Sequence, residues 1–184
     1  DEALALLRER VEAKDLQVTR SIDDPALAVR ADRDKILQVF LNLLGNAVKF
    51  SHERGSVAIV ARRGKPGFVV VQVKNQGVGI AKEDLEKIFD RFYQAGRGPA
   101  RGVEGTGIGL TIVRNILRLH GCVVHASSEP GEGTVLTFTL PVAGERVEEA
   151  RVPFPAERPP DPPRNSPAPR GDAERPRLRI IRRG

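Results

Sequence analysis

The sequence predicts an α+β fold, a two-layer sandwich in which one mixed, mainly antiparallel sheet is backed by helices. Two observations predict this class. Segments with helical spacing of apolar residues are interleaved with segments of alternating or continuous apolar residues along residues 1–142. Residues 143–184 contain nine of the fourteen prolines and few apolar residues, so we expect a domain over 1–142 and a disordered, Pro/Arg-rich tail over 143–184.

The first half of the domain begins with helical spacing over 3–13. Two short strands are expected next, at 16–22 and 27–31, because a turn-forming Asp-Asp-Pro separates the two runs. Asp32 then precedes a long apolar segment that continues to residue 51. An aspartate at that position is a good N-cap, so we expect a long helix over 32–51.

The second half begins with a hairpin, because apolar runs at 56–64 and 67–75 flank a Lys-Pro-Gly turn. Residues 82–94 have acids in the first turn and helical spacing, so a helix is expected there. A glycine-rich stretch over 96–109 leads into a helix expected over 108–121. Two final strands are expected at 122–129 and 133–141, with Pro141 ending the domain.

Composition excludes several classes of function. No run of about eighteen apolar residues is present, so no segment of this sequence is expected to span a membrane, and no signal-peptide pattern is present. One cysteine and three scattered histidines exclude a disulfide framework and argue against a zinc site. The net charge of +6 is spread along the chain and aromatic residues are few, so we expect no nucleic-acid partner. The chain lacks methionine and starts at Asp1, so we expect a fragment or a processed piece of a longer protein.

One polar stripe interrupts the apolar helix expected over 32–51. Its four residues are spaced by four, four and three, which places them on one face: Gln38, Asn42, Asn46 and Lys49. Two readings are open at this point, a face turned to solvent or to a neighbouring loop, and a face that lines a ligand cavity. In the second, amide oxygens suit Mg²⁺ and the ammonium suits a phosphate.

Two glycine-rich segments are compatible with a close backbone approach to a ligand, although a tight turn in the first and a plain flexible loop in the second are the alternatives. In the first, Gly77 and Gly79 come just after a strand and are preceded by Asn75. In the second, Gly105, Gly107 and Gly109 surround a helix start, where free N–H groups and the helix dipole favour an anion. The segment before it carries Arg97 and Arg101, which could reach a terminal phosphate.

In this order, five segments closely resemble the sequence boxes of the catalytic ATP-binding domain of bacterial two-component sensor histidine kinases. They are "QVFLNLLGNAVKFS", "NQGVGI", "IFDRFYQ", "GTGIGLTIVRNILRLHG" and "GEGTVLTFTLP". The resemblance covers residues 3–141 at natural spacing. It implies the Bergerat fold, a mixed sheet backed by helices with a lid over the nucleotide, and it implies ATP and Mg²⁺ as cofactors.

The resemblance also implies a role for each matching residue. Asn46 would coordinate Mg²⁺, and Asn42 and Lys49 would lie near the metal and the phosphates; Asn46 and Lys49 are the expected catalytic pair. The base would lie near a set drawn from three segments, Phe50, Asn75, Gly77, Gly79, Ile80 and Thr134. The lid and the phosphate side would be formed by Phe89, Phe92, Arg97, Arg101, Gly105, Thr106, Gly107, Gly109 and Leu110.

Asn42 separates this chain from other branches of the fold. Gyrase-like, mismatch-repair, heat-shock and anti-sigma relatives resemble one another in carrying a glutamate base four residues before the metal asparagine. Here that position is Asn42, an amide without useful basicity. This favours a kinase whose acceptor lies on another domain. The alternatives are a nucleotide-sensing pseudokinase and, less favoured, a self-contained ATPase.

No histidine of the chain has the surroundings of a phosphoacceptor. His52 is followed by Glu53 but then by Arg54 and Gly55, and His120 and His125 have no adjacent acid. The resemblance therefore implies partners beyond this chain: the phosphoacceptor hairpin of a parent kinase, and a response regulator receiver domain. We expect a homodimeric parent, a monomeric isolated domain and a cytoplasmic location, with the parent either soluble or an inner-membrane sensor.

One substitution departs from the family pattern in the base pocket. The first glycine box usually begins with an aspartate that accepts from the adenine amino group, and Asn75 stands there. An amide oxygen still accepts but lacks charge, so we expect ATP affinity weaker by about tenfold than with aspartate. The amide N–H could also turn towards a guanine O6, which predicts relaxed nucleotide choice.

Overall fold

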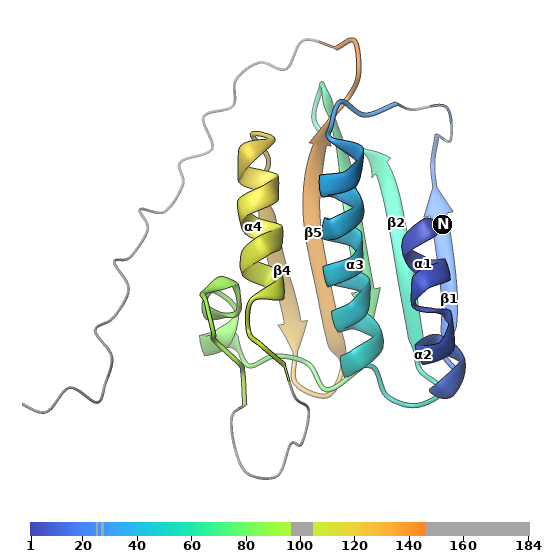
Figure 1. Cartoon of the computed structure of the whole chain (residues 1–184), viewed down its shortest axis with the longest axis vertical. Helices are drawn as coiled ribbons and strands as arrows, with labels where there is room; N and C mark the ends of the chain where they lie inside the picture. The colour runs from blue at the N-terminus through green and yellow to red at the C-terminus, as the bar shows by residue number, and fades with distance from the viewer. Residues whose placement is uncertain (25, 27, 97–104, 146–184) are drawn as a thin grey trace, which may run out of the picture. The chain divides into compact units, whose positions relative to one another are not determined.

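The computed structural model describes residues 1–24, 26, 28–96 and 105–145 of the chain. Its first layer is a five-stranded sheet with the order β1-β2-β3-β5-β4 (Figure 1). The strands are β1 (Gln17–Ile22), β2 (Ser56–Arg63), β3 (Phe68–Asn75), β4 (Val124–Glu129) and β5 (Gly133–Pro141). The β1–β2 pair is parallel and the other three pairs are antiparallel. The predicted mixed, mainly antiparallel sheet is thus confirmed.

The helices form the second layer and lie on one face of the sheet (Figure 1). They are α1 (Glu2–Leu6), α2 (Arg8–Ala13), α3 (Arg33–Phe50) and α4 (Gly109–Leu119). The core lies between the layers, where Val39 and Leu43 of α3 and Val113 of α4 are fully buried. The Phe40 and Phe138 rings meet edge to face across the layers, with centroids 5.7 Å apart. Burial of these side chains holds α3 on the sheet.

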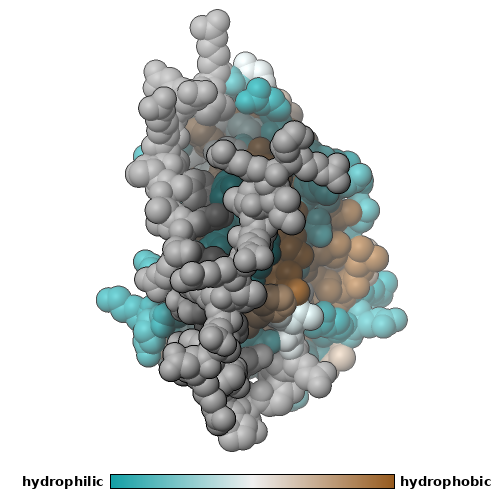
Figure 2. All heavy atoms as spheres, turned by 60° about the vertical axis from the view of Figure 1, so that its left-hand side comes forward, coloured by the Kyte–Doolittle hydropathy of each residue, from teal (hydrophilic) through white to brown (hydrophobic). Residues whose placement is uncertain are grey.

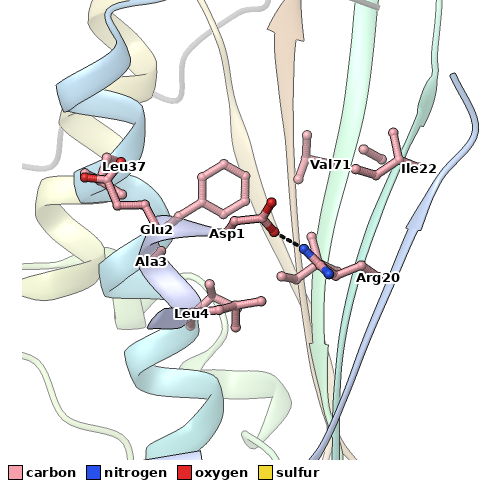
Figure 3. Close-up of a pocket in the computed structure, with 12 residues that line it drawn as sticks. Asp1, Glu2, Ala3, Leu4, Arg20, Ile22, Leu37 and Val71 are labelled. Atoms are coloured by element: carbon pink, nitrogen blue, oxygen red, sulfur yellow. Dashed lines mark hydrogen bonds and ion pairs between the residues drawn. The ribbon is translucent and has the colours of Figure 1, made fainter. Parts of the chain in front are cut away.

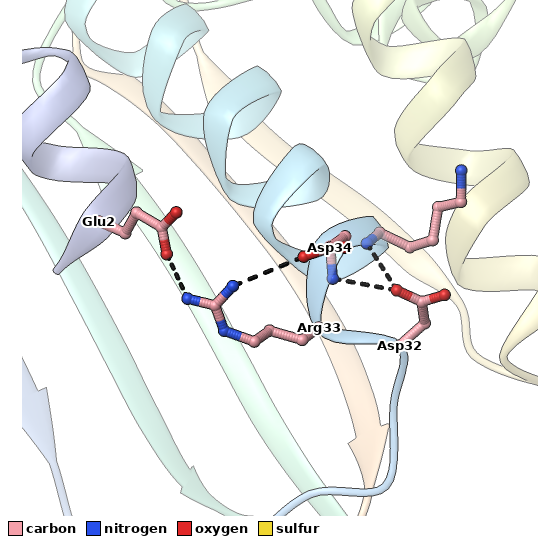
Figure 4. Close-up of polar contacts among 5 residues, drawn as sticks. Glu2, Asp32, Arg33 and Asp34 are labelled. Atoms are coloured by element: carbon pink, nitrogen blue, oxygen red, sulfur yellow. Dashed lines mark hydrogen bonds and ion pairs between the residues drawn. The ribbon is translucent and has the colours of Figure 1, made fainter.

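The start of α3 is fixed by the predicted cap (Figure 4). The Asp32 carboxylate accepts hydrogen bonds from the backbone N–H groups of Asp34 and Lys35, both at 3.0 Å. These bonds, the one from Lys35 first, lower the pKa of Asp32 below its ordinary value. Arg33 pairs with Glu2 at 2.5 Å, so the same turn of α3 also holds α1.

Three predicted elements differ from the structure. The opening helix is interrupted at Leu7, whose φ of −104° and ψ of 3° separate α1 from α2. Of the strand predicted over 27–31, the structure describes residues 28–31, and these form no strand; Val29 makes an isolated bridge with Val142. The helix predicted over 82–94 is replaced by two 3₁₀ turns, Lys82–Asp84 and Lys87–Phe89.

The 82–94 segment fails to form a helix for a local reason. Its two buried apolar residues, Ile88 and Phe89, are adjacent, so one short turn buries them without a helical stripe. The Phe89 carbonyl accepts from the Thr111 hydroxyl at 2.9 Å, which anchors that turn on α4. Phe92 then has a φ of +64°, a left-handed conformation that no α-helix continues.

The described chain continues slightly past the predicted domain end. Ala143 donates to the Ala28 carbonyl at 2.9 Å, and Glu145 pairs with Arg63 at 2.9 Å. Glu145 also accepts from the Gly67 backbone N–H at 3.1 Å. Residues 143–145 therefore contact the domain. The tail predicted for the remainder lies outside the described residues.

Candidate functional site

A single row of side chains crosses the whole sheet at the end where β3 finishes. Strand register pairs its members in sequence across β1, β2, β3, β5 and β4: Val18, Val57, Asn75, Thr134 and Ser128. Val57 is fully buried in the core between the sheet and the helices, and directly paired residues share a face. The row therefore runs along the helix-covered face and changes from apolar to polar at β3.

Ser128 links the polar part of this row to the first glycine-rich segment. Its hydroxyl oxygen accepts from the Ile80 backbone N–H at 2.8 Å and lies 2.9 Å from the Thr134 hydroxyl. It also donates to the Gly133 carbonyl. One side chain thus ties residue 80 to the first two residues of β5. Ser128 was not among the residues predicted from sequence.

The first glycine-rich segment packs tightly against the ends of α3 and β4. A Cβ on Gly77 would lie 2.1 Å from the Phe50 carbonyl oxygen, and a Cβ on Gly79 would lie 2.0 Å from that of Glu129. Gly79 also has a φ of +66°. Both positions therefore require glycine. In the described structure the close approach is to the protein backbone.

The polar stripe of α3 faces the second glycine-rich segment. A Cβ on Gly109 would lie 2.8 Å from the Asn42 side-chain oxygen, and a Cβ on Gly105 would lie 2.9 Å from the Lys49 Nζ. The Asn42 amide nitrogen donates to the Gln38 carbonyl at 2.9 Å, which leaves its oxygen for the α4 side. Asn42, Asn46 and Lys49 are half-buried. The structure thus brings the stripe and the start of α4 together.

The N-terminus of α4 has no side-chain cap. Ile108 occupies the N-cap position and cannot accept a hydrogen bond through its side chain. The first-turn N–H groups of a helix have no partner within the helix, and the helix dipole adds partial positive charge there. With the Lys49 ammonium beside Gly105, this end of α4 is suited to an anion.

The C-terminal end of α3 carries one aromatic residue of the predicted site and is contacted by Lys14, which was not predicted from the sequence. The Phe50 ring is partly exposed, and the Lys49 Nζ lies 5.1 Å from its centroid. The Lys14 ammonium donates to the Lys49 and Ser51 carbonyls at 2.7 and 2.9 Å. A cation there offsets the negative end of the α3 dipole and fixes the end of the stripe.

The two phenylalanines predicted at the lid differ in burial. Phe89 is 7% exposed and belongs to the core, whereas Phe92 is 65% exposed. The Phe92 N–H donates to the Gly107 carbonyl at 2.9 Å, and the Gln94 side chain donates to that of Gly105. Residues 92–94 are thereby joined to residues 105–107. Arg97 and Arg101 lie outside the described residues.

Tyr93 anchors residues 92–94 on the first of the two 3₁₀ turns. Its hydroxyl donates to the Asp84 carboxylate at 2.5 Å. This hydrogen bond to a negative acceptor is the largest cause of a rise in the pKa of Tyr93 to about 12. Tyr93 therefore stays protonated at neutral pH and fixes the start of the segment that leads to Gly107.

One hollow among the described residues lies away from this site (Figure 3). Its volume is about 530 Å³, and it lies between α1, α3, β1 and β2, with Leu4, Phe40 and Ile59 in its lining. Asp1 and Arg20, which form an ion pair, are part of its lining. None of the predicted site residues lines it. Its volume is in the range of ligand sites, but no predicted catalytic or binding residue belongs to it, so we do not assign the function there.

Apolar side chains reach the surface in a contiguous area of the face shown in Figure 2, with polar residues around it. Over the described residues, the large apolar side chains with high exposure are Leu6, Ile22, Val29, Phe50, Phe92 and Leu119. Isolated exposed apolar residues are common on protein surfaces. Phe50 and Phe92 differ from the others because they flank the polar stripe and the start of α4.

With this geometry established, comparison with known proteins decides the family. Residues 31–144 match the family described as histidine kinase-, DNA gyrase B-, and HSP90-like ATPase. The chain belongs to this family. Its Bergerat fold is the one found in histidine kinase catalytic domains, as the resemblance implied.

Three relatives place the chain in the histidine kinase branch. Sensor histidine kinase WalK of Bacillus subtilis (strain 168) is 37% identical over 142 residues, which are 77% of this chain and 23% of WalK. The catalytic domain of histidine kinase ThkA is 32% identical, with a TM-score of 0.66 over 76% of this chain and 89% of that one. Full-length ShkA in complex with AMPPNP is 30% identical, with a TM-score of 0.67 over 77% of this chain and 28% of ShkA.

ThkA also matches in a crystal structure with the response regulator protein TrrA, at a TM-score of 0.63 and 30% identity, over 76% of this chain and 38% of that one. The chain spans only 23%, 17% and 38% of the lengths of the first three curated relatives. No helix within the described ranges has the length and apolar character needed to cross a bilayer.

Proposed function

We propose that this domain binds Mg·ATP and transfers the γ-phosphate to a histidine on the phosphoacceptor hairpin of its parent kinase. The observation that carries the proposal is the meeting of the α3 polar stripe with the uncapped start of α4. Asn42 and Lys49 come from α3, and Gly105 and Gly109 from the segment opposite. A cation, the first-turn N–H groups of a helix and amide oxygens on two facing elements suit a polyphosphate with its metal.

In this proposal, the base lies at the polar part of the sheet row. Asn75 and Thr134 are directly paired across β3 and β5, and Gly77 brings its backbone next to the Asn75 amide. Ile80 is held there by Ser128. Asn75 would accept from the adenine amino group, and Phe50 would cover the nucleotide from the end of α3.

The phosphates would lie along the start of α4. Backbone N–H groups at Gly109 and Leu110 are in its first turn, and Lys49 stands beside Gly105. Thr106 and Gly107 connect these positions, and Gly107 has a φ of +67° that favours glycine. Arg97 and Arg101 remain candidates for the terminal phosphate from the segment outside the described residues.

The metal would be held mainly by the nucleotide. Among the residues that the structure describes, no three His, Cys, Asp or Glu side chains form a group that could hold a metal ion. The half-buried Asn46 therefore fits Mg²⁺, which commonly takes one or two protein oxygens and completes its shell with phosphates and water. When bound, the ion supplies charge neutralisation at the phosphate oxygens. Mg²⁺ binding should accordingly require nucleotide.

The acceptor is the second half of the proposal. Asn42 has no basicity, so the domain holds the nucleotide without a base to activate water, which favours phosphotransfer over hydrolysis. The partners would be the hairpin and, downstream, a response regulator receiver domain. ThkA, which matches this chain, is known in complex with such a regulator. We further propose a homodimeric parent, a monomeric isolated domain and a cytoplasmic location, where ATP is available.

Single-turnover phosphotransfer tests the function. The chain is mixed with γ-labelled ATP, Mg²⁺ and the acceptor hairpin of its parent, and label on the hairpin histidine is followed against released phosphate. We expect label on the hairpin and little free phosphate. Asn46→Ala should abolish transfer, whereas Asn115→Ala, an exposed asparagine of α4, should not. ATP binding without any transfer would support a nucleotide-sensing module, and steady phosphate release without the hairpin would support an ATPase.

A further inference from the structure

The hydroxyl proton of Ser128 can be located from its partners. Three groups contact its oxygen: the Ile80 N–H at 2.8 Å, the Gly133 carbonyl, and the Thr134 hydroxyl at 2.9 Å. A hydroxyl has one proton. The Ile80 N–H can only donate and the Gly133 carbonyl can only accept, so the Ser128 proton goes to Gly133.

This assignment fixes the proton of Thr134. Because Ser128 has already used its proton, the contact between the two hydroxyls is made by the Thr134 proton, donated to the Ser128 oxygen. The Thr134 oxygen then has only lone pairs to offer. Thr134 lies in the sheet row directly between Asn75 and Ser128, so those lone pairs belong to the same polar patch as the Asn75 amide.

We propose that Ser128 is a specificity-determining positioning residue, which makes Thr134 a pure acceptor and so selects a purine with an amino group over one with a carbonyl at position 6. The inference rests on the proposed nucleotide site. A 6-amino group can donate to Thr134, either directly or through a water. A 6-carbonyl presents an acceptor to an acceptor, which is unfavourable in a half-buried site.

Asn75 cannot discriminate by itself between a 6-amino and a 6-carbonyl purine. An amide can turn its oxygen towards an amino group or its N–H₂ towards a carbonyl, whereas an aspartate can only accept. On Asn75 alone, relaxed nucleotide choice is expected. Ser128 restores the preference for a 6-amino group by acting through Thr134. Its bonds to Ile80 and Gly133 prevent its hydroxyl from exchanging donor and acceptor roles, so the Thr134 hydroxyl keeps its orientation.

The test compares ATP with inosine triphosphate, which replaces the 6-amino group by a carbonyl and lacks the 2-amino group of guanine. Dissociation constants of both are measured by titration calorimetry with Mg²⁺ for the full chain. We expect the wild type to prefer ATP, so that the dissociation constant of inosine triphosphate divided by that of ATP is greater than one. Ser128→Ala should reduce this ratio by about two- to tenfold, because it frees the Thr134 proton to turn towards the 6-carbonyl. Ser127→Ala is the matched control, because Ser127 is exposed on the same strand and points to the opposite face.

A structural role alone would weaken both nucleotides equally and leave the ratio unchanged, which would overturn the inference. Thr134→Val should also lower the ratio, and the double variant should lower it no further than either single change. If Ser128→Ala does not fold, an unchanged ratio in Thr134→Val overturns the inference. Equal binding of ATP and inosine triphosphate by the wild type overturns it while leaving the proposed function intact. Failure to bind either nucleotide refutes the proposed function itself.

Discussion

Two glycines with similar φ values allow the energetic effect of close packing in the first glycine-rich segment to be separated from that of backbone strain. Gly79 and Gly121 have φ values of +66° and +67°. A Cβ on Gly79 would lie 2.0 Å from the Glu129 oxygen and 2.8 Å from the Pro130 Cα, whereas a Cβ on Gly121 would meet nothing within 4 Å. Alanine at Gly121 therefore introduces left-handed strain alone, about 1–2 kcal/mol. Alanine at Gly79 adds a clash with backbone, about 1–3 kcal/mol more.

The assay is urea unfolding of the two variants and the wild type. We expect Gly79→Ala to lower the free energy of unfolding by about 2–5 kcal/mol and Gly121→Ala by about 1–2 kcal/mol, with the same m-value. Since the Gly79 backbone also positions the Ile80 N–H on Ser128, only Gly79→Ala should weaken ATP binding. Equal destabilisation by the two substitutions would show that the segment yields to a methyl group, and the close-packing argument would then be wrong.

Three further substitutions test two residues of the site and the cap of α3. Asn75→Asp should tighten ATP binding by about tenfold, because a charged acceptor replaces a neutral one, while inosine triphosphate should gain nothing; equal gains for both would contradict this. Asn46→Ala should abolish Mg²⁺-dependent enhancement of ATP binding in calorimetry, and Asn115→Ala should preserve it. The pKa of Asp32 is lowered in the folded state, so the cap stabilises the fold in full when the pH is above the unfolded-state pKa. This stabilisation is lost as the pH falls through the folded-state pKa, which lies below 3.8. Asp32→Asn keeps the cap without titrating, so its melting temperature should fall less than that of the wild type on acidification; parallel curves would refute the cap as the cause.

The long helix and the strands β3 and β5 were predictable because each rests on local signals. Asp32 caps α3 where expected, and the two strands β3 and β5 have the predicted bounds or differ by one residue. Spacing within α3 also placed Asn42, Asn46 and Lys49 on one face. What spacing could not show is which element that face meets, since contact with Gly105 and Gly109 depends on where α4 docks.

Ser128 shows why the rest of the site needed the structure. Ser127 and Ser128 are adjacent, and alternation along a strand puts one on each face without saying which. Pairing with β5 settles it, because Ser128 is opposite Thr134 and Ser127 is opposite Val135. Lys14 was missed for a similar reason: its bonds to Lys49 and Ser51 join residues that are distant in sequence. The helix predicted over 82–94 was wrong because burial of two adjacent residues outweighed helical spacing.

The absence of a base at Asn42 is consistent with the kind of acceptor that we propose. Water or a hydroxyl must lose a proton when it attacks phosphorus, so an enzyme that uses either gains from a nearby carboxylate. A neutral imidazole attacks through a nitrogen lone pair and needs no base at that moment. An amide beside Gly109 also places no negative charge next to the start of α4, where the phosphates would lie. Asn42 therefore favours the bound triphosphate, and it leaves transfer to depend on a nucleophile that arrives already deprotonated.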